Sequence, residues 1–429
     1  MPAIIPIRGL RYSKKAGPLD RLLAPPYDVI TEAMRASLEA ASPYNAVHLE
    51  LAGGGDERYE RVAGLVAAWQ REGVLVRDAA PMLYAYEQRF VEDGREYARR
   101  GLICGVEAQP WDEGAVKPHE FTMSGPKEDR LKLLEAARVQ FSPVFMIARD
   151  RAGQLRQFLE TAASREPDAE GQTADGDHHR LWAVEAGRTE LRWLAPLLAE
   201  SFYIADGHHR YETAVTYRHL VEEREGRLPA DHPARYALAT VVAADDPGLV
   251  IRPIHRLVPR GAPPDWRERL GEAFRVTPLE LPAAGAAVAG SLASVLEAHP
   301  KGIVALGLDG AGAWLFEPTD RASIASRAPK GASDRWVSCA PNLLRYGVLE
   351  PLWDIGDDDL RAGAVEYTHD IGEVLAFLAG GDHRCAFLIR SVGVESVMAL
   401  ADQGERLPQK STFFHPKLAT GLVFYPLEP

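Results

Sequence analysis

The sequence has little cysteine and no long apolar run. Its three cysteines, Cys104, Cys339 and Cys385, are widely spaced and odd in number. This spacing excludes a disulfide framework or a zinc site built from paired cysteines, and it is typical of a reducing compartment. No stretch reaches the ~20 apolar residues of a membrane-spanning helix, and the first residues lack a signal-peptide core. We therefore expect a cytoplasmic protein with no membrane partner.

The sequence also has fewer basic than acidic residues. The chain has 49 Lys and Arg against 61 Asp and Glu, which gives a net charge of −12. Sequence-independent binding of nucleic acid takes its affinity from neutralising phosphates. An acidic chain without a basic block is therefore not expected to have a nucleic-acid partner. Nothing in the pattern indicates an oligomeric state.

Two well-known enzyme motifs are missing as well. The sequence has no Gly-x-Ser-x-Gly nucleophile elbow. The run Gly53-Gly54-Gly55 is a flexible turn and lacks the spacing of a dinucleotide-binding fingerprint. These absences argue against a serine hydrolase with a nucleophile elbow and against a dinucleotide-dependent enzyme.

What is present is an ordinary globular composition over 429 residues, with 46% apolar and 26% charged side chains. This length predicts two to three domains. We expect an N-terminal α/β segment at 1–110, a phosphate-binding module at 111–262, and a C-terminal α/β region at 263–429, where alanine, glycine and proline increase. Within the first segment, Asp93-Gly94 between two apolar runs predicts a β-hairpin.

The segment YIADGHHR, residues 203–210, combines an apolar strand with the start of a helix. The N-terminus of a helix binds phosphate or carboxylate through its unpaired N–H groups and partial positive charge. Gly207 lets a ligand approach the backbone, and Asp206 can hold a metal, accept a hydroxyl proton or only cap the helix. We interpret this turn as an anion site and not as a simple cap followed by surface histidines. The donor side chains that follow the glycine are His208, His209 and Arg210.

Four further polar clusters can contribute to a site. The loop KPHEFT offers Glu120 as a general base, although charged loop residues are usually only solvated. The segment QKST has a lysine beside two hydroxyls but lacks the glycines of a P-loop. RPIHR is either a cation cluster or a charged strand edge, and the stiff turn PPYD can aim two side chains in one direction. The candidate contacts to phosphate or nucleotide are Lys117, His119, Thr122, Arg130, Arg252 and His255, and the candidate contacts to substrate are Tyr27, Asp28, Lys410, Ser411, Thr412 and Lys417.

Taken together, these motifs resemble one family. PPYDVI, KPHEFT, YIADGHHRYETA, IRPIHR and PQKSTFFHPK, in this order along the chain, resemble the family of domain of unknown function 1015 (DUF1015). The central motifs are more distantly similar to the ParB/sulfiredoxin-like fold, which includes a free-serine kinase with a similar Asp-Gly-His-His-Arg and an upstream glutamate as base. This resemblance implies Glu120 as the base, although the insertion between the two motifs is much longer here. The residues that it implies as nucleotide and phosphate contacts are Asp206, His208, His209 and Arg210.

We therefore predict an α/β protein with a ParB/sulfiredoxin-like central module, a mixed sheet and a second C-terminal α/β region. The expected function is that of a phosphotransferase, a small-molecule kinase that acts on a small hydroxyl metabolite such as serine with ATP or ADP and Mg²⁺. Catalysis would come from Glu120, Asp206 and His208 around one cleft. Two alternatives remain open: a phosphatase- or nucleotidase-like hydrolase, and a non-catalytic protein that senses nucleotide or metabolite.

Overall fold

Two α/β units make up the chain in the computed structural model, which describes residues 3–122, 124–282, 286–310, 312–381 and 383–428. The first unit is formed by Met1–Pro118, Thr122–Val250 and Pro416–Pro429. The second unit is formed by His119–Phe121 and Ile251–His415. None of the helices in the described ranges is both long enough and apolar enough to cross a bilayer.

The first unit is built on a nine-stranded sheet with the order β6-β11-β8-β12-β5-β4-β10-β9, in which β1 also pairs with β5. β11 runs parallel to β6, and β12 runs parallel to β8, while the other pairs are antiparallel. This mixed sheet confirms the predicted α/β fold class. The strands are β1 (Ile4–Ile5), β4 (Met82–Glu92), β5 (Arg95–Glu107), β6 (Val116–Lys117), β8 (Val144–Ala148), β9 (Ala169–Gln172), β10 (His178–Glu185), β11 (Phe202–Asp206) and β12 (Tyr236–Ala243).

The hairpin of β4 and β5 supplies central strands of this sheet. Glu92 pairs with Arg95, and the two residues between them have positive φ, 50° at Asp93 and 74° at Gly94. These backbone angles are those of the tight turn that Asp-Gly predicts. Because β5 pairs with β12, strands from both sides of residue 110 share one sheet. The boundary expected at residue 110 therefore lies inside the first unit.

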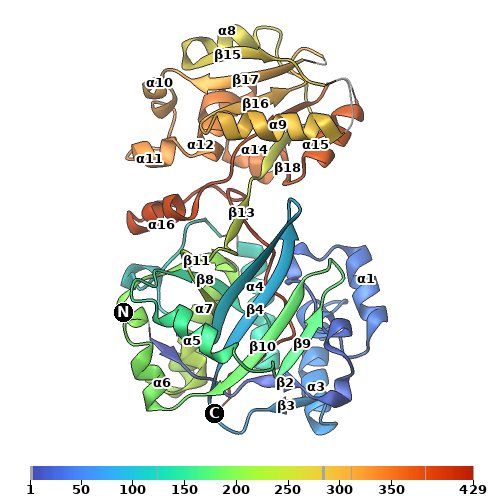
Figure 1. Ribbon diagram of the computed structural model, residues 1–429, viewed down its shortest axis with the longest axis vertical. Coiled ribbons are helices and arrows are strands. Elements are labelled where there is room, and N and C mark those ends of the chain that lie inside the picture. Colours follow the sequence, from blue (N-terminus) through green and yellow to red (C-terminus); the bar gives the residue numbers. More distant parts are fainter. Residues whose placement is uncertain (1–2, 123, 283–285, 311, 382, 429) are drawn as a thin grey trace. The chain divides into compact units, whose positions relative to one another are not determined.

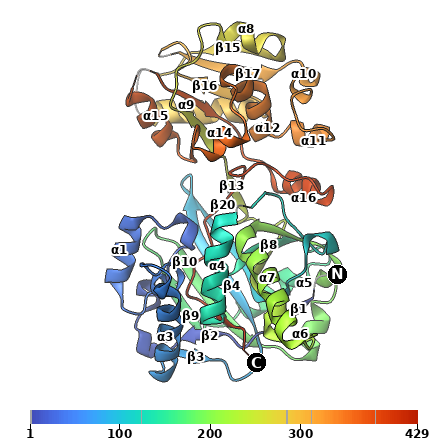
Figure 2. The ribbon, with the colours of Figure 1, turned by 180° about the vertical axis from the view of Figure 1, so that it is seen from behind.

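Helices cover this sheet. Figure 2 shows α4 (Ser124–Ala137) and α7 (His208–Glu225) side by side, and α7 buries apolar side chains such as Tyr211 and Ala214. The other helices of the unit are α1 (Glu32–Ala41), α2 (Val47–Glu50), α3 (Glu57–Arg71), α5 (Gln154–Ala162) and α6 (Arg188–Trp193). Two small pairs complete it, β2 (Leu10–Tyr12) with β3 (Leu75–Arg77), and β7 (Val139–Gln140) with β21 (Tyr425–Pro426).

The second unit has a six-stranded sheet with the order β15-β17-β16-β19-β14-β18 (Figure 1). Every pair in it is antiparallel. This sheet forms the second α/β region that the sequence predicts. The strands are β14 (His255–Val258), β15 (Phe274–Leu279), β16 (Ile303–Leu306), β17 (Ala313–Pro318), β18 (Glu366–Thr368) and β19 (Cys385–Leu388), and a separate pair joins β13 (Val250–Arg252) to β20 (Phe413–His415).

Both faces of this second sheet are buried. Ile303 and Ala305 of β16 belong to one apolar cluster, whereas Val304 and Leu306 belong to another. Successive side chains of a strand point to opposite faces, so the all-apolar run IVAL marks a strand covered on both sides. The covering helices include α8 (Trp266–Leu270), α9 (Ala286–Ala298), α10 (Arg321–Ala325), α11 (Asp334–Val337), α12 (Ala340–Leu344), α13 (Glu350–Trp353), α14 (Asp357–Arg361), α15 (Ile371–Ala379) and α16 (Val394–Asp402).

Candidate functional site

The turn between β11 and α7 has the predicted strand, glycine and helix. β11 ends at Asp206, and α7 begins at His208. Gly207 between them has a φ of 86°, and a β carbon there would lie 2.9 Å from the guanidinium group of Arg210. Only glycine therefore fits this position without strain. The amide groups of the first helical turn lack intrahelical acceptors and create a partial positive charge at this end of α7.

Asp206 pairs with two cations. Arg210 donates from Nη2 to Oδ2 of Asp206 at 2.6 Å, and Lys417 Nζ pairs with Oδ1. Burial by itself raises the pKa of Asp206, but the positive charges of Lys417 and Arg210 lower it further than burial raises it. The carboxylate is thus held ionised and is a weak proton acceptor. Its geometry suits the positioning of Arg210 and Lys417 better than proton transfer.

The Pro-Pro turn lies near the same cations. The ring centroid of Tyr27 is 4.3 Å from the guanidinium carbon of Arg130, which makes a cation–π contact. Burial raises the pKa of Tyr27 to about 12, and the charge of Arg210 opposes this shift. Asp28 is exposed, and its charge acts on Arg210 in the same way as that of Asp206. The first unit therefore brings together the predicted residues Tyr27, Asp28, Arg130 and Arg210.

Two of the predicted phosphate contacts are close to a carboxylate that sequence reasoning missed. Glu212 of α7 accepts hydrogen bonds from Thr122 Oγ1 at 2.8 Å and from Trp111 Nε1 at 2.9 Å, and pairs with Lys127 Nζ at 2.8 Å. These bonds attach the segment around Thr122 to the second turn of the helix. Burial lowers the pKa of His209, and the negative charge of Glu212 opposes that effect. The sequence feature that could have pointed to Glu212 is its position two residues after Arg210 on the same helix.

Lys117 and His208 lie around the same turn. Lys117 is at the end of β6, with Nζ 5.8 Å from the ring centroid of Tyr203 on the neighbouring strand. His208 is buried at the first position of α7, and its charge in the protonated state would help to keep Asp206 ionised.

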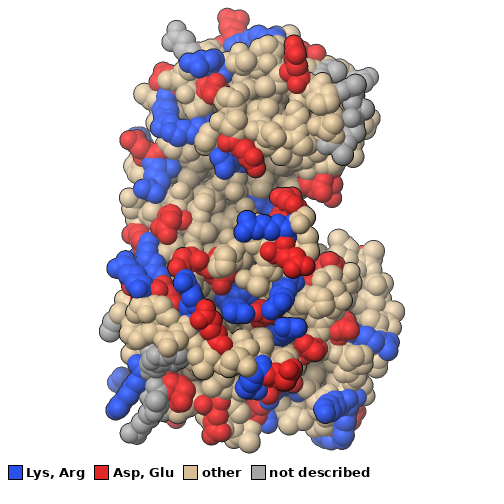
Figure 3. Space-filling model, viewed as in Figure 1, with Lys and Arg blue, Asp and Glu red and all other residues tan. Residues whose placement is uncertain are grey.

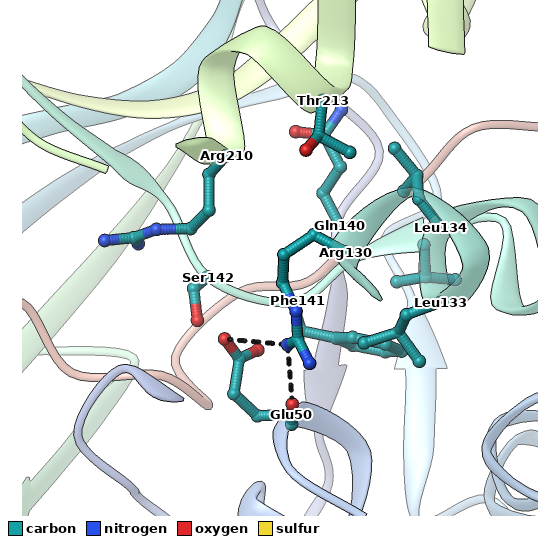
Figure 4. A pocket seen from close by; sticks show the side chains of 10 residues that line it. Glu50, Arg130, Leu133, Leu134, Gln140, Phe141, Ser142, Arg210 and Thr213 are labelled. Atoms are coloured by element: carbon teal, nitrogen blue, oxygen red, sulfur yellow. Dashed lines mark hydrogen bonds and ion pairs between the residues drawn. The ribbon is translucent and has the colours of Figure 1, made fainter. Parts of the chain in front are cut away.

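A small pocket opens beside Arg210 (Figure 4). Its volume is about 50 Å³, enough for a few water molecules or a small functional group. Glu50 and Arg130 face one another across it, with a dashed line between them in Figure 4. The remaining lining residues are Leu133, Leu134, Val139, Gln140, Phe141, Ser142 and Thr213.

In the second unit, Glu120 is fixed by the QKST segment. Its Oε1 accepts hydrogen bonds from the amides of Ser411 and Thr412, both at 3.2 Å, and from Thr412 Oγ1 at 3.1 Å. His119 Nε2 lies 2.8 Å from the same hydroxyl oxygen. Among the residues that the structure describes, no donor contacts Oε2 of Glu120. One carboxylate oxygen is therefore held in place while the other keeps its lone pairs for a ligand.

Two other predicted residues of this unit, His255 and Lys410, take part in hydrogen bonds that involve the main chain. His255 is buried, its Nδ1 lies 3.4 Å from the amide of Ile389, and burial lowers its pKa to about 4. A neutral histidine that accepts a main-chain hydrogen bond has a structural role, and the assignment of His255 as a phosphate contact stays a prediction. Lys410 is exposed with a φ of 60°, and its carbonyl oxygen accepts from Arg256 at 3.1 Å. Arg252 ends β13.

The predicted site residues are thus divided between the units. Asp206, His208 and Lys417 belong to the first unit, whereas Glu120 and Thr412 belong to the second. That Glu120, Asp206 and His208 surround one cleft stays a prediction.

The carboxylates were tested for a fit to Mg²⁺. In the described part of the chain, no three His, Cys, Asp or Glu side chains gather closely enough to hold a metal ion. Both oxygens of Asp206 pair with cations, so this side chain does not fit as a ligand. Mg²⁺ usually takes one or two carboxylates together with phosphates and water, and Asp28 is the exposed carboxylate available for such a role.

Charges are mixed over the surface shown in Figure 3. On that face, Lys and Arg side chains alternate with Asp and Glu and do not form a broad basic patch. This distribution is consistent with the net charge of −12.

Comparison with known proteins identifies the family. Residues 4–330 match the model described as protein of unknown function (DUF1015), and the chain belongs to this family. No curated protein matches the sequence.

Solved structures resemble the chain at low identity. A mutant free serine kinase in complex with ADP is 13% identical, with a TM-score of 0.37 and coverage of 75% of this chain and 92% of that chain. A conserved hypothetical protein from Pyrococcus furiosus is 15% identical, with a TM-score of 0.34 and coverage of 73% and 93%. SbnI with a C-terminal truncation from Staphylococcus aureus is 11% identical, with a TM-score of 0.36 and coverage of 76% and 87%.

Proposed function

We propose that this protein is a nucleotide-dependent phosphotransferase that acts on a small hydroxyl metabolite. The observation that carries the proposal is the turn at Gly207, where the N-terminus of α7 lies beside Arg210 and Lys417. Arg210 and Lys417 share the carboxylate of Asp206, although Asp28 and Glu50 also act on Arg210, and the N–H groups of the first helical turn add donors for a phosphate group. Phosphoryl transfer needs such cations and N–H groups more than it needs covalent chemistry from the protein.

Glu120 is the general base of the proposed reaction. Its Oε1 accepts three hydrogen bonds from neutral donors, which fix the carboxylate, and His119 Nε2 lies 3.7 Å from the same oxygen. A base must be held in position and keep a lone pair for the proton that it removes. Oε2, which has no donor among the described residues, meets this requirement. In the reverse direction the same group would return the proton to the metabolite.

Within this class we favour serine and phosphoserine as the metabolite pair, with ATP or ADP as the nucleotide. This finer assignment is supported by the Asp206–Arg210 motif, which resembles that of the free-serine kinase. Mg²⁺ would accompany the nucleotide and reduce the charge of its phosphates. The roles proposed for Lys117, His119, Thr122, His209 and Arg252 are contacts to nucleotide or phosphate, and those proposed for Tyr27, Lys410, Ser411 and Thr412 are contacts to the metabolite.

Phosphorus NMR on the purified protein tests this function. The protein is incubated with ATP or ADP, Mg²⁺ and either serine or phosphoserine, and we expect a new phosphorus signal only when nucleotide and metabolite are both present. Release of inorganic phosphate without an acceptor would favour the hydrolase. Nucleotide binding by calorimetry without any turnover would favour the sensing protein.

A further inference from the structure

Glu50 is a buried carboxylate at the C-terminal end of α2. The residue is 3% exposed, and it lines the pocket beside Arg210 together with Arg130 and Ser142. Figure 4 shows its carboxylate pointing into this pocket. Glutamate is almost never fully buried unless its charge is paired, so its surroundings need an explanation.

The structure supplies no hydrogen-bond donor to this carboxylate from the residues it describes. The one ion pair of Glu50 is with Arg130, whose Nη1 lies 4.0 Å from Oε1, beyond hydrogen-bond distance. Arg130 uses its donors elsewhere: Nη1 bonds to the main-chain oxygen of Glu50 at 2.8 Å, and Nε bonds to Asp129 at 2.9 Å. A carboxylate oxygen can accept more than one hydrogen bond, and those of Glu50 accept none from the described residues. A ligand that brings a donor would use this capacity.

There is room for such a ligand on both sides of Glu50. Besides the pocket at Arg210, a second pocket of about 170 Å³ is lined by Glu50, Tyr59 and Arg130. Asp129 pairs with both Arg130 and Arg58, and it also accepts from the hydroxyl of Tyr59 at 2.8 Å. Glu50 is therefore the carboxylate of this wall whose hydrogen-bonding capacity is unused. A primary ammonium group fits it, because it is a compact cation with three donors.

We propose that Glu50 is a specificity-determining residue that binds a primary ammonium group of the acceptor. This proposal rests on the proposed function and deepens it: the acceptors are small compounds that carry both a hydroxyl and an ammonium group. Arg210 lines the same pocket and also adjoins the phosphate site, so the acceptor would bind next to the transferred phosphoryl group.

Matched acceptors test the proposal. L-Serine and 3-hydroxypropionate both have a hydroxyl and a carboxylate, but only serine has the ammonium group. We expect the parent protein to prefer serine in kcat/KM. Glu50→Gln should reduce this preference about 10- to 150-fold, chiefly through a higher KM for serine. This is the change in affinity expected from the loss of a hydrogen bond to a charged group. Transfer to 3-hydroxypropionate should stay unchanged. Glu60→Gln, which changes an exposed carboxylate on α3, is the control and should behave like the parent.

A thermal-shift measurement separates this inference from the proposed function. Serine should raise the melting temperature of the parent, 3-hydroxypropionate should raise it less, and the difference should vanish in Glu50→Gln. Without ligand, this variant should melt close to the parent temperature, because the ion pair that it removes spans 4.0 Å and includes no hydrogen bond to the carboxylate. A lower melting temperature with an unchanged serine preference would show that Glu50 is structural and overturn the inference. If serine binds but no phosphoryl group is transferred to either acceptor, the proposed function alone is refuted. If neither binding nor transfer is observed, the proposed function and the inference are both refuted.

Discussion

Asp206 in the first unit and Glu120 in the second are both partly buried carboxylates, but their partners differ in kind. Asp206 is held by the charged groups of Arg210 and Lys417. Glu120 is held through one oxygen by the amides of Ser411 and Thr412 and by a hydroxyl. Cations and hydrogen-bond donors both favour the charged form of a carboxylate. The two sites differ in that both oxygens of Asp206 are engaged by cations, whereas the donors at Glu120 occupy one oxygen and leave the other accessible. From this difference we propose that Asp206 positions the neighbouring cations and that Glu120 transfers the proton.

The largest effect is expected from Glu120→Gln. Glutamine keeps the shape and an oxygen that can accept from Ser411 and Thr412, but it cannot remove a proton. Turnover should therefore fall by ~10²–10⁴-fold, the usual contribution of a general base, while nucleotide affinity stays the same. A turnover assay beside calorimetric titration measures both quantities. Glu366→Gln, at an exposed position of the same unit, is the control and should have the turnover and nucleotide affinity of the parent. Normal turnover in Glu120→Gln would show that Glu120 only holds the Ser411–Thr412 segment in place, and the proposed contrast with Asp206 would be wrong.

Asp206→Asn should act on stability instead. Removing one partner of a buried ion pair takes a negative charge away from Arg210 and Lys417 and costs about 3–5 kcal/mol of unfolding free energy. Denaturant titration at neutral pH measures this loss, with the exposed Asp231→Asn as control.

The pH dependence of the unfolding free energy of the same variant tests the direction of the pKa shift of Asp206. The pKa of Asp206 in the folded protein lies below its unfolded value of about 3.9. Its stabilising contribution is thus present above about pH 4 and is lost as the pH falls further. The difference in unfolding free energy between the parent and Asp206→Asn should become smaller below that pH. A difference that stays constant down to pH 2 would show that the ion pairs are not its cause.

His255 allows a third test, now within the second unit. Burial lowers its pKa to about 4, so between pH 6.5 and pH 4 the unfolded chain binds a proton that the folded chain does not. This histidine should cost stability as the pH falls through that window, by about 3 kcal/mol in total at 1.4 kcal/mol per pKa unit. His255→Gln should flatten the unfolding free energy against pH over this range. The exposed His178→Gln should leave the slope as it is.

The smallest effect is expected from Arg210→Ala. Loss of a charge-assisted contact costs about 1.5–3 kcal/mol, or roughly 10- to 150-fold in nucleotide affinity. Calorimetric titration with ATP or ADP measures it. Arg224→Ala removes a cation from the opposite end of α7 and is the matched control. Equal affinity in Arg210→Ala and the parent would mean that the turn at Gly207 does not bind phosphate.

Much of the local structure follows from short patterns. The Asp93-Gly94 hairpin, the strand before Asp206 and the helix after Gly207 were predictable, since each depends on neighbours along the chain and on the positive φ that glycine adopts without strain. Glu50 and Glu212 were not predicted as parts of the site. Their partners come from segments tens of residues away: Arg130 forms an ion pair with Glu50, and Trp111 donates a hydrogen bond to Glu212.

The sequence by itself determined the α/β class and the polar motifs, because hydrophobic periodicity and turn residues act over a few positions. Only the tertiary structure decided which groups meet: that Lys417 from the C-terminal segment neutralises Asp206, that Ser411 and Thr412 hold Glu120, and that His255 is buried. The strength of such contacts depends on distance in space and on local burial, and separation along the chain specifies neither.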